Sequence, residues 1–171
     1  YAISRTSKRL LKKLGVWGNL DEKFEPIKKI ILSESNNKTM DATKLAEFDL
    51  QDESEEPTSY MVEDFEIRSA LNLKLRASKN VEILTRCKVV SEEIAKGGSI
   101  ISLDNEKKIF ASLFVICDGP KSSIARGIKK KFISKDYNQV AIVANVNHIN
   151  AHNGEAHQIF FSSGPIASLP L

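Results

Sequence analysis

The sequence lacks the features that mark membrane-spanning, secreted and disulfide-stabilised proteins. It has no run of about 18 apolar residues, so we expect no transmembrane helix. Its Lys-rich start lacks the apolar stretch of a signal peptide. The only cysteines, Cys87 and Cys117, lie in apolar, strand-like runs, which argues against a disulfide framework and favours a reducing cytosol. What is left is a globular chain of 171 residues, 42% of them hydrophobic, which is enough for one sizeable core.

Familiar catalytic and phosphate-binding motifs are lacking as well. The eight glycines never form G-x-G-x-x-G or a P-loop, the elements that usually cradle a nucleotide's phosphates. There is no G-x-S-x-G nucleophile elbow. His148, His152 and His157 are interspersed with Asn and Gly, which disfavour a metal-binding helix. We therefore expect no metal site and no catalytic triad.

Positive and negative side chains nearly balance over the whole chain, but they are strongly segregated along it. Residues 1–32 carry eight Lys/Arg against three Asp/Glu, residues 33–66 carry two against eleven, and residues 67–171 carry fifteen against eight. An acidic middle between basic flanks indicates a segment with its own surface. The net charge of +3 is too small to indicate nucleic acid, so we expect no such partner. Because residue 1 is Tyr and the first methionine is Met40, we expect a piece of a longer protein.

The hydrophobic spacing predicts a mixed order of helices and strands. Helices are expected over 3–14, with Gly15 as the C-cap, and from Glu63 onward. A turn near 34–37 and a solvated acidic loop over 52–57 fit the polar runs there. Strands are expected over 27–32, 81–84, 87–90, 99–103, 109–117 (which ends in the apolar run 113–117), 140–146 and 156–161. The run 113–117 is uninterrupted and apolar, which is typical of a strand buried on both faces.

That run leads directly into the most informative element, Asp118-Gly119 followed by a polar helix start at Ser122-Ser123. Ligands of α/β proteins bind where strands end and helix N-termini offer free N–H groups. An Asp at such an edge can accept hydrogen bonds from ribose hydroxyls or from water on a pyrophosphate, and Gly permits close approach. Taken alone, most Asp-Gly pairs are simple turns.

In context, the chain resembles the central portion of the flavin-dependent aromatic hydroxylases, specifically those of ubiquinone biosynthesis. Four stretches carry the resemblance in order: 2–17, 60–71, 117–141 and 156–171. The last ends in Gly-Pro-Ile-Ala-Ser-Leu-Pro-Leu, the most specific of the four. One departure concerns Arg126, which comes one residue later than the family spacing from Ser122. Either this Arg has slipped, or Ser123 is the family serine.

The resemblance implies an incomplete FAD-binding domain of the para-hydroxybenzoate-hydroxylase type with a β-sheet substrate lobe. Residues 1–25 and 60–127 would form the FAD part, and 26–59 and 128–171 the substrate part. The family's N-terminal dinucleotide-binding motif would lie before residue 1 and its C-terminal part after residue 171. The charge segregation agrees with a chain that passes between two lobes.

By the same resemblance, six residues would line the FAD site: Arg5, Glu63, Asp118, Gly119, Ser122 and Arg126. Five would form a wall beside the flavin and the substrate ring: Gly164, Pro165, Leu169, Pro170 and Leu171. Proline suits such a wall because it fixes the chain and removes a competing N–H. Without the family context, this stretch reads equally as a strand end broken by proline.

The implied function is hydroxylation of an aromatic polyprenyl-phenol in ubiquinone biosynthesis, with NAD(P)H, O₂ and a flavin hydroperoxide. The catalytic residues are not assigned, and the isolated chain is expected to be inactive. The implied location is the cytoplasm, with peripheral membrane contact aided by the basic flanks and contact with other ubiquinone-biosynthesis proteins. Two alternatives remain: a non-enzymatic truncated remnant, and an α/β binding module with a basic surface.

Overall fold

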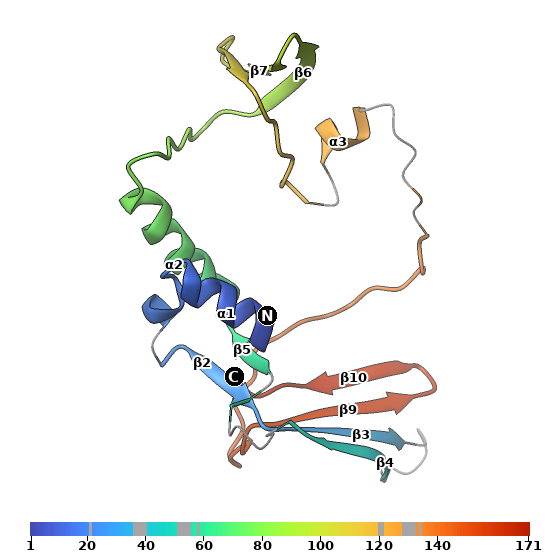
Figure 1. Cartoon of the computed structure of the whole chain (residues 1–171). Helices are drawn as coiled ribbons and strands as arrows, with labels where there is room; N and C mark the ends of the chain where they lie inside the picture. The colour runs from blue at the N-terminus through green and yellow to red at the C-terminus, as the bar shows by residue number, and fades with distance from the viewer. Residues whose placement is uncertain are drawn as a thin grey trace. The chain divides into compact units, whose positions relative to one another are not determined.

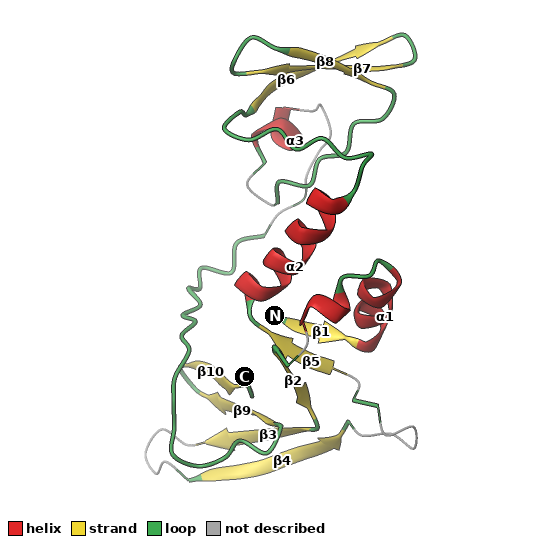
Figure 2. Ribbon diagram, turned by 90° about the vertical axis from the view of Figure 1, so that its left-hand side faces the viewer, coloured by secondary structure: helices red, strands yellow, loops and turns green. Residues whose placement is uncertain are grey.

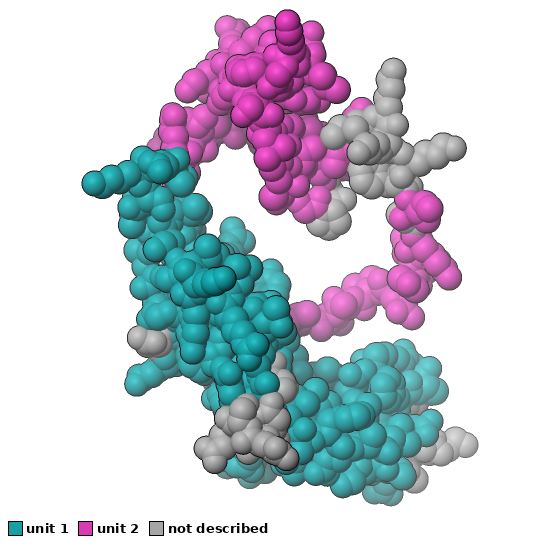
Figure 3. All heavy atoms as spheres, viewed as in Figure 1, with its two compact units in different colours: residues 1–81, 146–171 teal, residues 82–145 magenta. Residues whose placement is uncertain are grey.

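The structure, a computed structural model, describes residues 1–20, 22–35, 41–50, 56–57, 59–119, 122–127, 133 and 135–171. Its contacts divide the chain into two compact units, coloured separately in Figure 3. Unit 1 comprises Tyr1–Val81 and Val146–Leu171, and unit 2 comprises Glu82–Asn145. In the described part of the chain, no helix is long and apolar enough to cross a membrane.

Both units mix helices and strands, which confirms the predicted α/β class. Unit 1 holds β1 (Ala2–Ser4), α1 (Arg5–Lys13), the 3-10 helix η1 (Trp17–Leu20), β2 (Phe24–Ile27), β3 (Lys29–Ser35), β4 (Ala42–Asp49), β5 (Ser59–Val62), α2 (Asp64–Ala77), β9 (Glu155–Phe161) and β10 (Gly164–Ser168). Unit 2 holds β6 (Val89–Ala95), β7 (Gly98–Leu103), β8 (Lys108–Ala111) and α3 (Ser123–Gly127).

Unit 1 contains two sheets, and Figure 1 shows the strands of the larger one side by side. The smaller sheet has the order β1-β5-β2 and the larger the order β10-β9-β3-β4. All pairs are antiparallel except β3–β9, which is parallel. The antiparallel pairing of β3 with β4 agrees with the expected hairpin, although residues 36 and 37 of its turn lie outside the described residues. Residues 52–55 of the expected acidic loop over 52–57 also lie outside them.

Helix α1 is shorter at its start than predicted, because Ala2–Ser4 pair with β5 as strand β1 (Figure 2). Ile3 packs against the core from that strand. The Ser4 side chain then caps the helix by accepting a hydrogen bond from the Ser7 N–H at 3.2 Å. At the other end Gly15, with φ +66°, donates to the Lys12 carbonyl, and the Val16 N–H donates to that of Leu11. These two bonds form the Schellman motif that the glycine favours.

The core of unit 1 lies between the helices and the smaller sheet. Its fully or nearly fully buried members are Leu11, Val16, Trp17, Leu20, Tyr60, Val62 and Ala70. Helix α2 begins after Glu63 as predicted and contributes Ala70, with Ile67 and Leu71 packed beside it. A second cluster of Ile27, Met61 and Ala156 joins the smaller sheet to the larger.

Three predicted strands are wrong. Residues 81–88 have no strand, and β6 begins only at Val89. Residues 109–111 of the expected strand 109–117 lie in β8, but its run 113–117 is neither helix nor strand. The same holds for 140–146, and Leu113 and Val140 are 76% and 92% exposed. An apolar run becomes a strand only when a neighbour pairs its backbone groups. In unit 2 the described sheet has the order β6-β7-β8, and neither run joins it.

Candidate functional site

One pocket of unit 1 brings together two of the residues singled out from the sequence. It has a volume of about 330 Å³ and is lined by Glu22, Lys23, Phe24, Glu25, Glu63, Glu66 and Leu171. Glu63 is the N-cap residue of α2, and Leu171 follows β10 at the far end of the chain. We call this the Glu63 pocket. A predicted cofactor-side residue and a predicted substrate-wall residue thus line one space.

The Glu63 pocket combines carboxylates with apolar surface. Lys23 of the pocket pairs with Glu66 at 2.7 Å, and Glu22, Glu25 and Glu63 are further carboxylates of the lining. The Phe24 ring lies 4.9 Å from that of Trp17 and 5.5 Å from that of Tyr60, measured between centroids. Carboxylates can accept hydrogen bonds from hydroxyl groups, and the ring surface can pack against an aromatic ligand.

Next to this aromatic cluster lies a buried lysine that our sequence reasoning missed. Lys8 is 8% exposed, and its Nζ donates to the Tyr60 hydroxyl at 2.6 Å and to Glu56 Oε1 at 2.9 Å. The same Nζ lies 4.0 Å from the centroid of the Tyr60 ring. Burial disfavours the ammonium, but the hydrogen bonds that Lys8 donates to Tyr60 and Glu56 outweigh this effect and raise the pKa of Lys8. A signal was present: Lys8 lies three residues before the core residue Leu11, on the same helical face.

Arg5, the other predicted residue in this region, begins α1. Its Nη2 donates to the main-chain carbonyl of Glu56. Arg5 and Lys8 therefore both hold Glu56, and they tie α1 to the segment that enters β5. Hydrogen bonding to Lys8 also lowers the pKa of the Glu56 carboxyl.

The Asp118 region forms a separate site within unit 2. Asp118 lines a pocket of about 350 Å³ together with Lys88, Val89, Phe114, Val115, Ile116, Cys117, Ser123 and Ile124. We call this the Asp118 pocket. Gly119 has φ +84°, a conformation that suits glycine at this bend. The pocket offers an ammonium, a carboxylate and a hydroxyl in largely apolar surroundings.

The structure brings Ser122 and Arg126 together despite their unusual spacing. Ser122 is 4% exposed, and its Oγ accepts a hydrogen bond from the Ala125 N–H at 2.9 Å, so it caps α3. Arg126 Nε donates back to the Ser122 carbonyl at 3.0 Å. Of the two serines considered from the sequence, Ser122 is thus the one that contacts the arginine, while Ser123 lines the Asp118 pocket.

The five predicted wall residues are split between the two ends of β10. Gly164 and Pro165 begin the strand, where they pair with Phe161 and Phe160 of β9. Leu169, Pro170 and Leu171 follow its end, and Pro170 is fully buried whereas Leu169 is 48% exposed. Of the five, Leu171 lines the Glu63 pocket.

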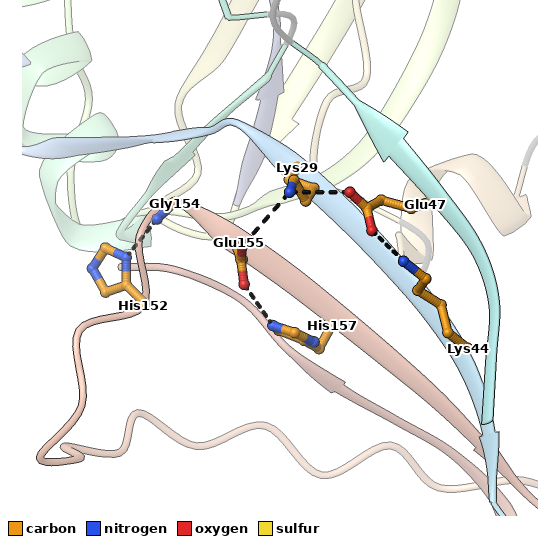
Figure 4. Close-up of polar contacts among 7 residues, drawn as sticks. All are labelled: Lys29, Lys44, Glu47, His152, Gly154, Glu155 and His157. Atoms are coloured by element: carbon orange, nitrogen blue, oxygen red, sulfur yellow. Dashed lines mark hydrogen bonds and ion pairs between the residues drawn. The ribbon is translucent and has the colours of Figure 1, made fainter. Parts of the chain in front are cut away.

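Ion pairs cross the larger sheet beside this segment (Figure 4). Lys29 on β3 lies 3.0 Å from Glu47 on β4 and 3.9 Å from Glu155 on β9, so one ammonium links three strands. Glu47 also pairs with Lys44 at 2.7 Å. The hydrogen bonds from Lys44 and then Lys29 lower the pKa of Glu47.

Two of the histidines have structural contacts in the same view (Figure 4). His152 Nδ1 accepts a hydrogen bond from the Gly154 N–H at 3.1 Å, within the turn before β9. His157 Nε2 lies 3.3 Å from Glu155. Within the described residues, no group of three or more His, Cys, Asp or Glu side chains is placed to hold a metal ion.

Comparison with known proteins gives the same family over almost the whole chain. The mitochondrial ubiquinone biosynthesis monooxygenase COQ6 of Caenorhabditis elegans is 29% identical over 99% of this chain. The ubiquinone hydroxylase UbiL of Rhodospirillum rubrum is 28% identical, also over 99%. The chain is a homologue of the ubiquinone-biosynthesis monooxygenases. It spans 38% of the length of each of these two relatives.

The fold has a counterpart among solved structures. The crystal structure of the tetracycline destructase Tet(55) aligns with 98% of this chain and 41% of its own, with a TM-score of 0.56 and 10% identity. No protein-family model matches the sequence. The homology therefore comes from the individual relatives, and the structural likeness supports the fold.

Proposed function

We propose that this chain forms part of an FAD-dependent monooxygenase that hydroxylates an aromatic polyprenyl-phenol in ubiquinone biosynthesis. The observation that carries the proposal is the Glu63 pocket, because it joins Glu63 from one side of the proposed site to Leu171 from the other. The homology to monooxygenases and hydroxylases of ubiquinone biosynthesis supports the reaction class.

Each pocket, taken by itself, fits a different part of FAD. The Glu63 pocket offers carboxylates for the ribityl hydroxyls and Phe24 for the ring system, and its negative charge disfavours a pyrophosphate. The Asp118 pocket offers the Lys88 ammonium, which suits a pyrophosphate, and the Asp118 carboxylate, which suits a ribose hydroxyl. When bound, FAD reduced by NAD(P)H supplies the oxygen-transfer chemistry with O₂.

The chain's own residues would bind, orient and exclude water. Glu63 would accept hydrogen bonds from the cofactor, and Asp118 and Gly119 would allow its close approach. Within unit 2, Ser122 and Arg126 would hold the α3 end of the Asp118 pocket. Within unit 1, Arg5 would hold α1 against the segment that enters β5. Leu171, with Leu169 and Pro170 before it, would form an apolar wall that keeps water from the reacting ring. Gly164 and Pro165, at the other end of β10, would continue that wall along the strand.

The proposed lobes are supported by the pairing of the strands in unit 1. Strands β3 and β4 come from 26–59, β9 and β10 come from 128–171, and the four form one sheet. Strand β1 comes from 1–25, and β5 comes from 60–127 except for its first residue, Ser59. These two strands form the smaller sheet with β2. We propose that the larger sheet belongs to the substrate lobe of a para-hydroxybenzoate-hydroxylase type of fold.

We further propose that the protein works in the cytoplasm in peripheral contact with a membrane, near other ubiquinone-biosynthesis proteins. The worm relative is named mitochondrial and the bacterial one is not. A polyprenyl substrate partitions into lipid, so an enzyme that acts on it gains from lying at the bilayer surface.

Flavin binding can be tested through Trp17, the only tryptophan, whose ring contacts Phe24 of the Glu63 pocket. We expect FAD to quench its fluorescence saturably, after correction with free N-acetyltryptophanamide. Glu63→Ala should raise the Kd roughly tenfold through the loss of a charged hydrogen-bond acceptor. Glu93→Ala, on β6, is the control and should change nothing. Unsaturable quenching, or equal effects of both variants, would contradict the proposal. The isolated chain should lack hydroxylase activity, and NAD(P)H turnover by it with FAD and a phenol would contradict that expectation alone.

A further inference from the structure

The outer face of α1 combines exposed leucines with exposed cations. Leu10 and Leu14 are 58% and 47% exposed, whereas Leu11 of the same helix is buried in the core. Leu10, Lys13 and Leu14 are three and four residues apart, so they share one strip of the helix surface. The core therefore accounts for one leucine of α1 and leaves two in water. We call Arg9, Leu10, Lys12, Lys13 and Leu14 the α1 surface.

The charge of the α1 surface is wholly positive. Residues 1–20 contain five Lys/Arg and no Asp or Glu. Lys8 and Arg5 are engaged with Glu56, but Arg9 and Lys13 form no ion pair within the described residues. The Lys74 ammonium of α2 lies beside Gly15 at the end of α1. Its Nζ would be 3.2 Å from a Cβ atom added to that glycine.

Helix stability explains only part of this arrangement. Cations in the last turn, such as Lys12 and Lys13, interact favourably with the helix dipole. The dipole explains neither Arg9 nor the two exposed leucines. A second copy of the chain would bring like charges together. Nucleic acid would use the cations and leave Leu10 and Leu14 without a role.

We propose that the α1 surface docks on an anionic lipid bilayer. A basic helix with an apolar strip lies in the plane of the interface, with its leucines in the acyl boundary and its lysines at the phosphates. The inference deepens the proposed membrane contact by naming the residues that make it. It does not depend on flavin binding or on hydroxylation.

The test is flotation of the purified chain with vesicles. We expect binding to phosphatidylcholine vesicles that contain phosphatidylglycerol, little binding to phosphatidylcholine alone, and loss of binding at high salt. Replacing both lysines (Lys12→Gln with Lys13→Gln) should lower the partition coefficient roughly 30-fold. Leu10→Ser with Leu14→Ser should also release the chain. The mutated side chains are exposed, so the fold should be kept, and the urea midpoint should fall only slightly through the lost interaction of Lys12 and Lys13 with the helix dipole.

Matched controls come from elsewhere in the chain. Leu45→Ser on β4 removes a leucine that is 57% exposed, and Lys107→Gln with Lys108→Gln removes two cations near β8. Neither should alter flotation.

Equal binding to neutral vesicles, or equal losses in the control variants, would overturn the proposal. Binding to duplex DNA that competes with vesicles and ignores the leucine substitutions would assign the surface to a polyanion instead. Because Trp17 reports FAD separately, failure of flavin binding alone would count against the proposed function and not against this surface.

Discussion

At the scale of single residues, the buried Lys8 ammonium is the group of the fold that most needs compensating contacts. This ammonium is stabilised by the Tyr60 hydroxyl and by Glu56. Tyr60→Phe removes the first of these partners and leaves the ring in place, so the free energy of unfolding should fall by about 1–3 kcal/mol. Urea unfolding followed by circular dichroism would measure it. Tyr137→Phe, at a residue 74% exposed, is the control and should stay within about 0.5 kcal/mol of the parent. Equal stability of the Tyr60 variant and the parent would show that water replaces the hydroxyl.

The resemblance indicated several positions but not the residues that each of them contacts. Glu63, Leu171 and Ser122 were selected by resemblance, and the structure gives them a pocket or a hydrogen bond. Lys8 was passed over because a lysine in a basic helix is ordinarily solvated. Its burial depends on Tyr60, which is 52 residues away in the sequence. Such a contact follows from the packing of the chain and not from any local spacing.

At the scale of elements, the larger sheet is linked by Lys29 and Glu47. The pKa of Glu47 lies below its ordinary value of 4.5, because Lys44 and Lys29 donate hydrogen bonds to its carboxylate. Its contribution to stability is therefore complete above pH 4.5 and is lost as the pH falls through the lower, folded pKa. Glu47→Gln should flatten the fall in stability below pH 4.5, measured as urea midpoints against pH. Glu93→Gln on β6 should leave the curve unchanged, and an unaltered curve for Glu47→Gln would contradict the assignment.

Elements with a strong local signal were predictable, and those that need a distant neighbour were not. Gly15 and the hydrophobic spacing predicted α1, and the hydrophobic spacing predicted α2 from Glu63 onward. Helix α1 begins later than predicted because Ile3 pairs with Tyr60 of β5, which is a long-range contact. The runs 113–117 and 140–146 have every local property of strands, yet no described strand pairs with them. Strand formation is a property of two segments, so one segment cannot settle it.

At the scale of the whole molecule, the chain combines homology to one family with a pocket in each unit and the basic α1 surface. The sheet pairings join segments far apart in the sequence, such as β3 with β9, and so support a chain that leaves one lobe and returns. The resemblance indicated this course, which periodicity alone could not. The mixed fold and the homology to ubiquinone-biosynthesis monooxygenases agree with it.

The most direct measurement is hydroxylation by a chimera. This chain would replace the 170 matched residues of the Rhodospirillum rubrum UbiL, expressed in a bacterium that lacks its own ubiquinone hydroxylase. We predict that mass spectrometry will detect hydroxylated ubiquinone precursors, and that Glu63→Ala and Asp118→Ala in the chimera will remove them while Glu93→Ala will not. A folded, flavin-containing chimera that forms no hydroxylated product would contradict the account.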